Sequence, residues 1–538
     1  MKKIRGRPQA AKHRPQLVTE TLFRYPFSMI PYFCRRFSRF LLLATLGMAP
    51  TLQAQLPECR PFLEGPRLPL QGSDNALRTG ATTLSDECVQ VSVFGVTIPT
   101  MTVSYRSAYP FDRDDGSRWT GRGLTTAFTA GGRFEAGPLR VVLDPAVSYQ
   151  QNRDFTLVGN RGFRYPYHTL DWPQQPGRGS FWTFAPGQSM IALQAGAAEV
   201  ALSTENLWWG PARRYPILLS NSAPGFIHMR LGTSRAVDLG FAKLDLDILW
   251  GRLDESGQFD AIQDNDHRLF TGVFLELRPA FAPGLSLGIA GVQHNRWDEA
   301  GRLFLNLFTF PFNEEESTVG NGLLSFQASW QLKESEADFY AEWAREDFWL
   351  NADDLLSEID HSQGYLLGFE KIVRGSSTPL RISGELIHLG ASPTFQSRGQ
   401  TKGRVSFYEH GLVPQGHTNR GQLLGAAIGP GSDAQYLAAE LLFDRRTLGI
   451  YLERIRRDED AYFDRFVHIY AFRGHDIEWT AGLMGEETAG QMRIQWESAL
   501  SRRKNRNFIG LDGVNWDFLR ETNLAVTMRA WWQPEAER

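Results

Sequence analysis

Apolar and polar residues alternate one by one along much of the chain. In residues 322–333 the apolar positions, each followed by a polar residue, are Leu324, Phe326, Ala328, Trp330 and Leu332. A period of two residues places the apolar side chains on one face of a β-strand and the polar ones on the other. The same alternation returns in residues 243–250, 491–497 and 524–532.

This pattern predicts about 18 strands between residue 119 and the end of the chain. Two of the less regular ones are 303–309 and 465–473, and the alternation fails within 189–225, where a tight turn near Gly196 would restore it. Many amphipathic strands without matching helices favour an all-β fold, a transmembrane antiparallel β-barrel of the outer-membrane type. Its apolar row would contact lipid and its polar row a hydrated lumen.

Connections of two lengths support the barrel. Residues 136–138, 374–379 and 445–447 are tight turns. The long connections are 151–188, 252–267, 349–362, 391–434 and 503–518. Short turns on one side of the membrane and long loops on the other are typical of outer-membrane barrels.

Composition agrees with a barrel and excludes two other classes. The chain has 538 residues and a mean hydropathy of −0.32, and no uncharged apolar run after residue 54 could span a bilayer as a helix. A net charge of −3 gives no reason to expect nucleic acid as a partner. The 15 Trp and 36 Phe residues would suit aromatic girdles at the two membrane interfaces.

The N-terminus has the pattern of an export signal. Three arginines, at 35, 36 and 39, precede the apolar stretch 40–48, and Leu52 and Ala54 occupy positions −3 and −1 of a cleavage site. We therefore expect a signal peptide over 1–54, with Met29 as an alternative start. The predicted order continues with an N-terminal segment (55–111), the barrel (112–532) and a short tail (533–538).

Two cysteines remain after the predicted signal. Cys59 and Cys88 form an even pair in an exported chain, so we predict a disulfide between them. The alternative is two unpaired thiols.

Charged residues recur on the polar face of the predicted strands. We expect them to form ion pairs in the lumen, with a selectivity filter as the alternative. They are Asp245, Asp247, Glu276, Arg278, Asp338, Glu342, Glu385, Glu453, Arg493 and Glu497.

Five segments resemble one known family. Residues 203–226 contain the run Trp208-Trp209-Gly210-Pro211, and His228 follows shortly after. Together with segments 115–123, 138–149, 339–347 and 416–431, in this order, the run resembles the Wzi family of outer-membrane capsule-assembly proteins over residues 112–532.

The resemblance implies an 18-stranded outer-membrane barrel that binds capsular or other surface polysaccharide at the cell surface, as a lectin-like protein without catalysis. We expect a monomer that contacts outer-membrane lipid and needs no cofactor. A barrel of this width could also be a porin for small solutes. A hydrolase is less favoured, because the chain has no Gly-x-Ser-x-Gly motif and no convincing Ser/His/Asp group.

The polysaccharide would be bound by aromatic and charged residues of two segments. Trp208 and Trp209 could stack on sugar rings, while Glu205, Arg213 and Arg214 could bind hydroxyls or acidic sugar carboxylates. The alternative is structural, because adjacent tryptophans in an extended chain point to opposite sides.

His417 and Arg420 are the second group of candidates. They lie in the long segment 391–434, and long loops are often functional. We expect contact with an acidic glycan, and packing within the loop is the alternative. No zinc-site spacing accompanies the histidines, so no metal is predicted.

Overall fold

The computed structural model describes residues 94–110, 115–157, 170–259, 265–297, 320–346, 362–375, 378–392, 406–411, 413–466, 474–508 and 519–532. The chain divides into two units, Met1–Glu58 and Cys59–Arg538, and all of the described residues belong to the second. The predicted signal peptide, the cysteines of the predicted disulfide, the predicted strand 303–309 and the tail 533–538 lie outside the described residues.

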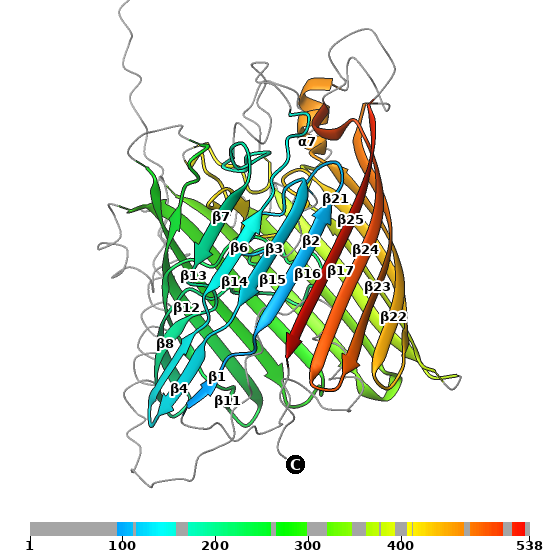
Figure 1. The fold of residues 1–538 in the computed structure, drawn as a ribbon. Coiled ribbons are helices and arrows are strands. Elements are labelled where there is room, and N and C mark those ends of the chain that lie inside the picture. Colours follow the sequence, from blue (N-terminus) through cyan, green and yellow to red (C-terminus); the bar gives the residue numbers. More distant parts are fainter. Residues whose placement is uncertain are drawn as a thin grey trace, which may run out of the picture. The chain divides into compact units, whose positions relative to one another are not determined.

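The described residues are almost entirely β-strand (Figure 1). The first strands are β1 (Phe94–Val96), β2 (Thr100–Arg106), β3 (Gly123–Thr129), β4 (Gly132–Ala136), β5 (Leu139–Leu143), β6 (Ala146–Gln150), β7 (Phe181–Ala185), β8 (Met190–Ala195), β9 (Ala198–Ser203), β10 (His228–Thr233), β11 (Val237–Asp238) and β12 (Ala242–Asp254).

The remaining strands are longer. They are β13 (His267–Pro279), β14 (Leu285–Arg296), β15 (Asn321–Leu332), β16 (Ala337–Glu346), β17 (Gln363–Val373), β18 (Leu380–His388), β21 (Asp433–Leu442), β22 (Arg446–Arg457), β23 (Asp476–Ala489), β24 (Met492–Lys504) and β25 (Arg520–Trp532). The short pair β19 (Thr418–Asn419) and β20 (Gln422–Leu423) forms a separate sheet. Single helical turns are η4 (Lys333–Ser335), α7 (Glu459–Ala461), η6 (Tyr462–Phe466) and η8 (Arg506–Phe508).

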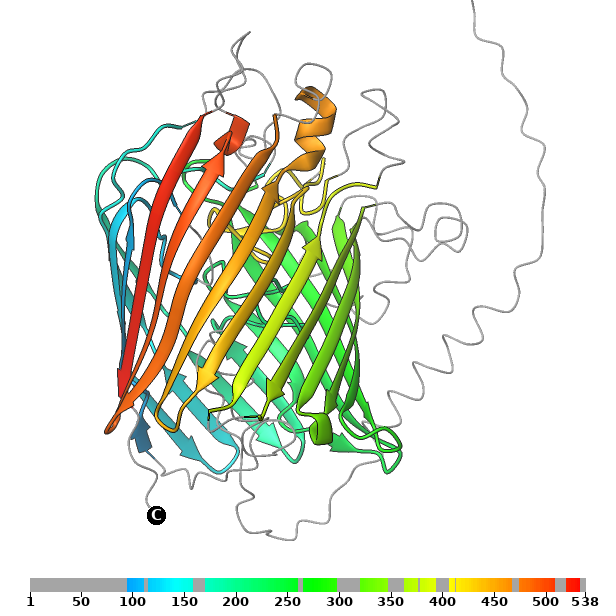
Figure 2. The same ribbon diagram turned by 90° about the vertical axis from the view of Figure 1, so that its right-hand side faces the viewer.

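The strands form one antiparallel sheet of 23 segments. From β12 to β25 each long strand pairs with the next one along the chain, as Figure 2 shows for β21 to β25 in yellow to red. The last strand, β25, pairs with β2 from Thr100↔Trp531 to Arg106↔Ala525. The pairing therefore returns to the first long strand, as in a barrel.

Interruptions explain why the segments outnumber the predicted strands. β1 and β2 are two successive parts of one strand, which lies beside β4 and β3. In the same way, β5 and β6 are two parts of one strand, and β7 and β8 are two parts of the next. A short break also separates β10 from β11. The prediction of about 18 strands refers to whole strands of the barrel, several of which are divided into two segments here. The all-β barrel class is confirmed.

The outer face of the wall is apolar, as the alternation predicts. Phe326 and Trp330 on β15 are 46% and 49% exposed, and Phe339 on β16, which lies opposite Trp330 in the ladder, is 53% exposed. Similar exposed apolar side chains recur on β8, β22, β23 and β25, for example Leu193, Ile450, Leu483 and Met528. Exposed apolar side chains in this number, along the outer face of a barrel, are typical of a surface that contacts lipid.

The inner face corrects one expectation. The lumen is not lined by polar groups and water alone, because inward side chains such as Leu249, Phe270 and Leu366 are fully buried in an apolar cluster. Segments that fold into the barrel from its connections supply the rest of this cluster, including Ile217, Leu218 and Leu424. A barrel lumen can be dry where chain fills it.

The connections fall on two sides as predicted. Tight turns such as 443–445 and 490–491 join strands at one end, and the long segments 204–227 and 413–432 lie at the other. The tight turn at Gly196 is confirmed: this residue has φ +64° and divides the predicted strand 189–203 into β8 and β9.

Some boundaries differ from the predictions. The sheet begins at Phe94, so β1 and β2 belong to the barrel although we placed residues up to 111 in a separate segment. β7 lies in the predicted loop 151–188, and Tyr462–Phe466 is helical where a strand was expected from 465. A short apolar run does not by itself show whether the segment is a strand, a helix or a loop, because this depends on the segments that pack against it. No helix among the described residues is long and apolar enough to cross a membrane.

Candidate functional site: a segment that fills the lumen

Residues 204–227, which we call the plug, leave the wall between β9 and β10 and cross the inside of the barrel. Ser203 and His228, which flank the plug, are register partners in the wall. Gln188 holds the first turn, because its side-chain oxygen accepts a hydrogen bond from the Asn206 amide at 2.9 Å. The plug then contacts β16, β17, β18 and β22, which are not neighbours of β9 or β10 in the sheet.

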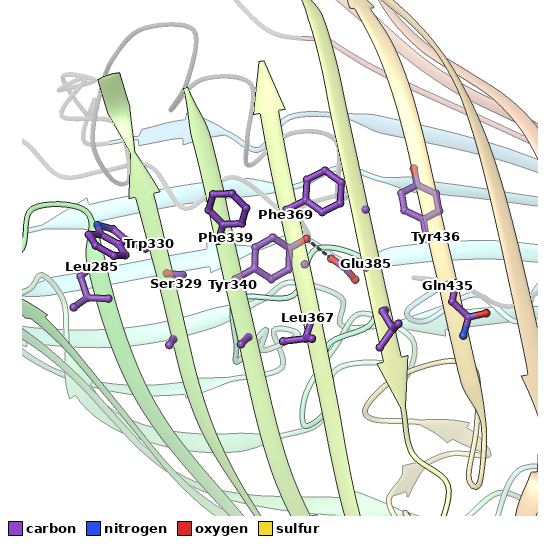
Figure 3. Close-up of a pocket in the computed structure, with 15 residues that line it drawn as sticks. Leu285, Ser329, Trp330, Phe339, Tyr340, Leu367, Phe369, Glu385, Gln435 and Tyr436 are labelled. Atoms are coloured by element: carbon purple, nitrogen blue, oxygen red, sulfur yellow. Dashed lines mark hydrogen bonds between the residues drawn. The ribbon is translucent and has the colours of Figure 1, made fainter. Parts of the chain in front are cut away.

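Glu385 on β18 binds the tip of the plug. Its carboxylate accepts hydrogen bonds from the backbone amides of Arg213 (2.6 Å), Arg214 (3.0 Å) and Tyr215 (3.1 Å). The hydroxyl of Tyr340 on β16 donates to the same carboxylate at 2.7 Å, as Figure 3 shows. One buried carboxylate thus satisfies three successive amides that would otherwise be costly to bury.

The two arginines of the plug form ion pairs with the wall. Arg213 pairs with Asp338 on β16 and Glu370 on β17. Arg214 pairs with Glu453 on β22 through Nε at 2.9 Å. The guanidinium of Arg214 also lies over the rings of Tyr436 and Tyr451, at 4.0 and 5.0 Å from their centroids. Arginine suits such sites because it combines ion pairing with stacking.

The adjacent tryptophans have different environments. Trp209 is only 3% exposed and stacks on Phe274 of β13, with ring centroids 5.6 Å apart. Gly272 makes room for it, since a Cβ there would lie 2.8 Å from the Trp209 ring. Trp208 is half-buried and donates through Nε1 to the carbonyl of Ala212 at 3.0 Å. Trp209 therefore fixes the plug to the wall opposite the Arg214 contact.

A second segment covers the plug. We call residues 406–411 and 413–432 the closing loop. The hydroxyl of Tyr408 donates to the Ile217 carbonyl at 2.6 Å, and the Ser220 amide donates to the Leu424 carbonyl at 2.7 Å. Asn419 donates to the Pro224 carbonyl at 3.0 Å. The closing loop and the plug thus share one buried core.

His417 lies inside this core and not on the surface. Its side chain is fully buried, its Nε2 lies 2.6 Å from the Leu218 carbonyl oxygen, and its Nδ1 lies 2.8 Å from Nε2 of His294. The ring stacks on Tyr408 with centroids 5.3 Å apart. Burial lowers the pKa of His417 to about 4, and the nearby Arg268 acts in the same direction, so the ring is neutral.

Arg420 is the exposed member of the predicted set. Its side chain is 50% exposed and binds Asp254, at the end of β12, through Nη2 at 2.8 Å. Arg420 has φ +50°, and the next residue, Gly421, packs against Pro173 and Trp119. The backbone therefore presents this guanidinium at the end of the barrel that carries the long loops.

The predicted site residues therefore separate by location. Trp209, Arg213, Arg214 and His417 are engaged inside the barrel, whereas Arg420 is exposed. Glu205 is half-buried and accepts from the Ser203 hydroxyl at 3.1 Å. Glycan contact by the seven residues stays a prediction, and the structural alternative matches the contacts of the buried ones.

The expected luminal ion pairs are present. Arg278 pairs with Asp245, and Arg493 lies 3.6 Å from Glu486. Several predicted charges pair with other segments and not with each other: Asp338 and Glu453 bind plug arginines, and Asp247 binds Arg230 at 2.9 Å. The contacts of the plug that the sequence did not indicate include Tyr340 and Glu370. Their signal is an irregular, apolar segment of 24 residues, which must be buried somewhere.

A depression on the outer face is not a ligand site of the lumen. A depression of about 660 Å³ near Tyr340 is lined mainly by apolar residues of the outer face, including Trp330, Phe339 and Leu367, so it faces lipid (Figure 3). No cluster of His, Cys, Asp and Glu within the described ranges could hold a metal ion.

Comparisons with known proteins agree with this architecture. The outer-membrane protein Wzi of Escherichia coli, described as a carbohydrate-binding β-barrel involved in group 1 capsule assembly, has a similar fold. Its TM-score is 0.54 at 13% identity, over 80% of this chain and 83% of that one. OccAB1 of Acinetobacter baumannii gives a TM-score of 0.41 at 7% identity, over 82% and 97% of the two chains, a likeness too weak for any structural argument. None of the curated proteins matches the sequence.

The family assignment follows from the sequence match. A model of the capsule assembly protein Wzi family matches residues 120–508. This range contains the plug, the closing loop and the strands that bind the plug. The chain belongs to the capsule assembly protein Wzi family.

Proposed function

We propose that the protein is an outer-membrane barrel that binds capsular or other surface polysaccharide and anchors it at the cell surface, as a lectin-like protein without catalysis. It would be exported through a cleaved signal peptide over residues 1–54 and would act as a monomer surrounded by outer-membrane lipid. The family and the carbohydrate-binding description of the Escherichia coli protein support this function.

The observation that carries the proposal is the filled lumen. The plug is bound to the far wall through Glu385 and Glu453, and the closing loop packs on it from the side of the long loops. A porin needs a continuous aqueous path, and apolar residues such as Ile217, Leu218 and Leu424 occupy this region of the barrel. The arrangement therefore favours an anchor over the porin alternative.

We propose that the polysaccharide contacts the outer surface of the closing loop and not the buried arginines. Arg420 presents half of its side chain there. Trp172, half-buried, packs against Gly429 of the closing loop and offers an aromatic ring at the same end of the barrel. A guanidinium and an aromatic face suit the carboxylates and the C–H faces of acidic sugars.

Removal of the protein tests the proposal. A cell that lacks it should release polysaccharide into the medium, and the full chain should restore retention. The measurement is the ratio of cell-bound to released polysaccharide. Unchanged retention in the deletion strain would contradict the proposed anchoring.

A further inference from the structure

The outer face of β22–β25 carries an unusual set of basic residues. In the ladder, one row across the four strands is Arg456–Ile477–Lys504–Arg520, and the next is Arg454–Trp479–Arg502–Thr522. All eight residues alternate with buried, inward residues such as Glu453, Glu478 and Arg503, so they face outward. Five of the eight are cationic.

The two rows lie at the end of the apolar surface. The row below them, on the same face, is Leu452–Ala481–Leu500–Leu524, in which the three leucines are 58%, 57% and 42% exposed. The long connections follow these strand ends, so the rows lie on the side of the long loops. A basic band directly above an apolar band is placed at the level of lipid headgroups.

Two of the five cations are partly neutralised by described carboxylates. Arg454 and Arg456 share the carboxylate of Asp433 at 2.9 and 2.6 Å, and Glu459 lies 3.3 Å from Arg456. Arg502 and Arg520 are exposed, and neither forms an ion pair with any residue in the described part of the chain. Among the described residues, positive charge therefore remains uncompensated at the β24–β25 end of the rows.

The basic rows are not a general property of this rim. At the same ends of β6 and β7, the paired outward residues Tyr149 and Trp182 carry no charge. On β23, in contrast, Trp479 stands between Arg454 and Arg502 and is 57% exposed. Strand spacing makes the rows about 14 Å wide and about 7 Å apart, the size of a sugar-phosphate headgroup.

We propose that these two rows bind the phosphate-bearing headgroup of an acylated glycolipid in the outer leaflet. Arg502 and Arg520 contact phosphate, Trp479 packs on a sugar ring, and the acyl chains lie on the leucine row below. Arginine favours phosphate because its planar donors bind two oxygens at once. The exposed ring of Trp479 between Arg454 and Arg502 favours a glycolipid over a simple anionic phospholipid, because a sugar ring can pack on it. This site is separate from the proposed polysaccharide surface.

Native mass spectrometry of the full chain in detergent tests the site. The probe is a diphosphorylated, acylated glucosamine disaccharide, compared with its dephosphorylated form, phosphatidylglycerol and inorganic phosphate. We expect the diphosphorylated glycolipid to bind the wild type roughly tenfold more tightly than the dephosphorylated form. Inorganic phosphate should not displace it, because the acyl chains contribute to binding.

The variants are Arg502→Gln with Arg520→Gln, and Arg446→Gln as the matched control. Arg446 also faces outward on β22, but at the opposite end of the strand. The double variant should bind the glycolipid roughly tenfold more weakly and the control should not change, while both keep the heat-modifiable mobility of a folded barrel. Equal binding by wild type and double variant would overturn the site, and so would equal binding of the dephosphorylated glycolipid. Equal binding of phosphatidylglycerol would overturn the assignment to a glycolipid. Polysaccharide retention is a separate readout, so failure here leaves the proposed anchoring to its own test.

Discussion

Arg214 and Glu453 form an ion pair at 2.9 Å although they are 239 positions apart in the sequence. Arg214 belongs to the plug and Glu453 to the inner face of β22. The pair joins two parts of the barrel that are not neighbours in the sheet. Breaking a buried pair by removing one partner is strongly destabilising, because the other charge remains buried. The plug therefore depends on single carboxylates of the far wall.

Neutralising Glu453 should loosen the plug. In Glu453→Gln the Arg214 guanidinium loses its ion-pair partner, and we expect a local loss of about 3–5 kcal/mol. Hydrogen–deuterium exchange of residues 213–220 measures the effect as a loss of protection. Glu487→Gln is the control, because Glu487 is exposed on β23 at the other end of the barrel. Unchanged protection of the plug in Glu453→Gln would show that the pair does not hold it.

Filling the space above Gly272 should displace Trp209. A Cβ at this position would lie 2.8 Å from the Trp209 ring and 3.3 Å from the Gly291 carbonyl oxygen, so Gly272→Ala requires a shift. We expect a cost of about 1–3 kcal/mol, measured as faster exchange of the plug amides. At Gly257 the space around an added Cβ is open, so Gly257→Ala should behave as wild type. A Gly272→Ala variant with normal exchange would contradict the fixed position of Trp209.

Acid should loosen the closing loop through His417. The pKa of this histidine is lowered by burial from 6.5 to about 4, so the folded state favours the neutral ring. The stability that it contributes is complete above pH 6.5 and is lost progressively as the pH falls toward 4. Protection factors of the Leu424 and Ser220 amides should fall over this range.

His417→Gln is the matched variant for the acid effect, because glutamine can still donate to the Leu218 carbonyl but does not titrate in this range. Its protection factors should fall less steeply between pH 6.5 and 4 than those of the wild type. If the wild type and His417→Gln show the same pH profile, His417 is not the group responsible for the acid effect.

Arg420 should matter for polysaccharide binding more than its contacts inside the protein suggest. Arg420→Gln keeps hydrogen-bonding capacity toward Asp254 but loses the charge at the exposed surface. We expect roughly tenfold weaker binding of an acidic polysaccharide on a glycan array, with normal heat-modifiable mobility. The control is again Arg446→Gln at the opposite end of the barrel. Equal binding by Arg420→Gln and wild type would move the glycan contact elsewhere.

The outer face of the barrel could be predicted from the sequence because it depends on local alternation. Phe326 and Trp330 face lipid simply because they alternate with Ser325, Gln327 and Ser329. Turn length and Gly196 likewise report on local backbone geometry. These features need no knowledge of distant residues.

The plug could not be predicted in the same way, because its partners are distant in the sequence. The sequence indicates a ligand-binding role for Arg213, whereas the structure pairs this arginine with Asp338 and Glu370. Apolar residues such as Leu249 and Phe270 also lie on the inner face, where the alternation predicts polar residues. They belong to one apolar cluster with residues 217–219 of the plug, which the sequence does not place beside them.

Planar-bilayer conductance of the wild type and of a plug-excised variant tests the filled lumen most directly. Because Ser203 and His228 are register partners, a short Asn-Gly turn can join β9 to β10 in place of the plug. We predict that the wild type gives no large stable conductance steps and that the excised variant, once its folded barrel is verified, gives them. Large stable steps from the wild type, or a variant that stays closed, would contradict a lumen closed by residues 204–227.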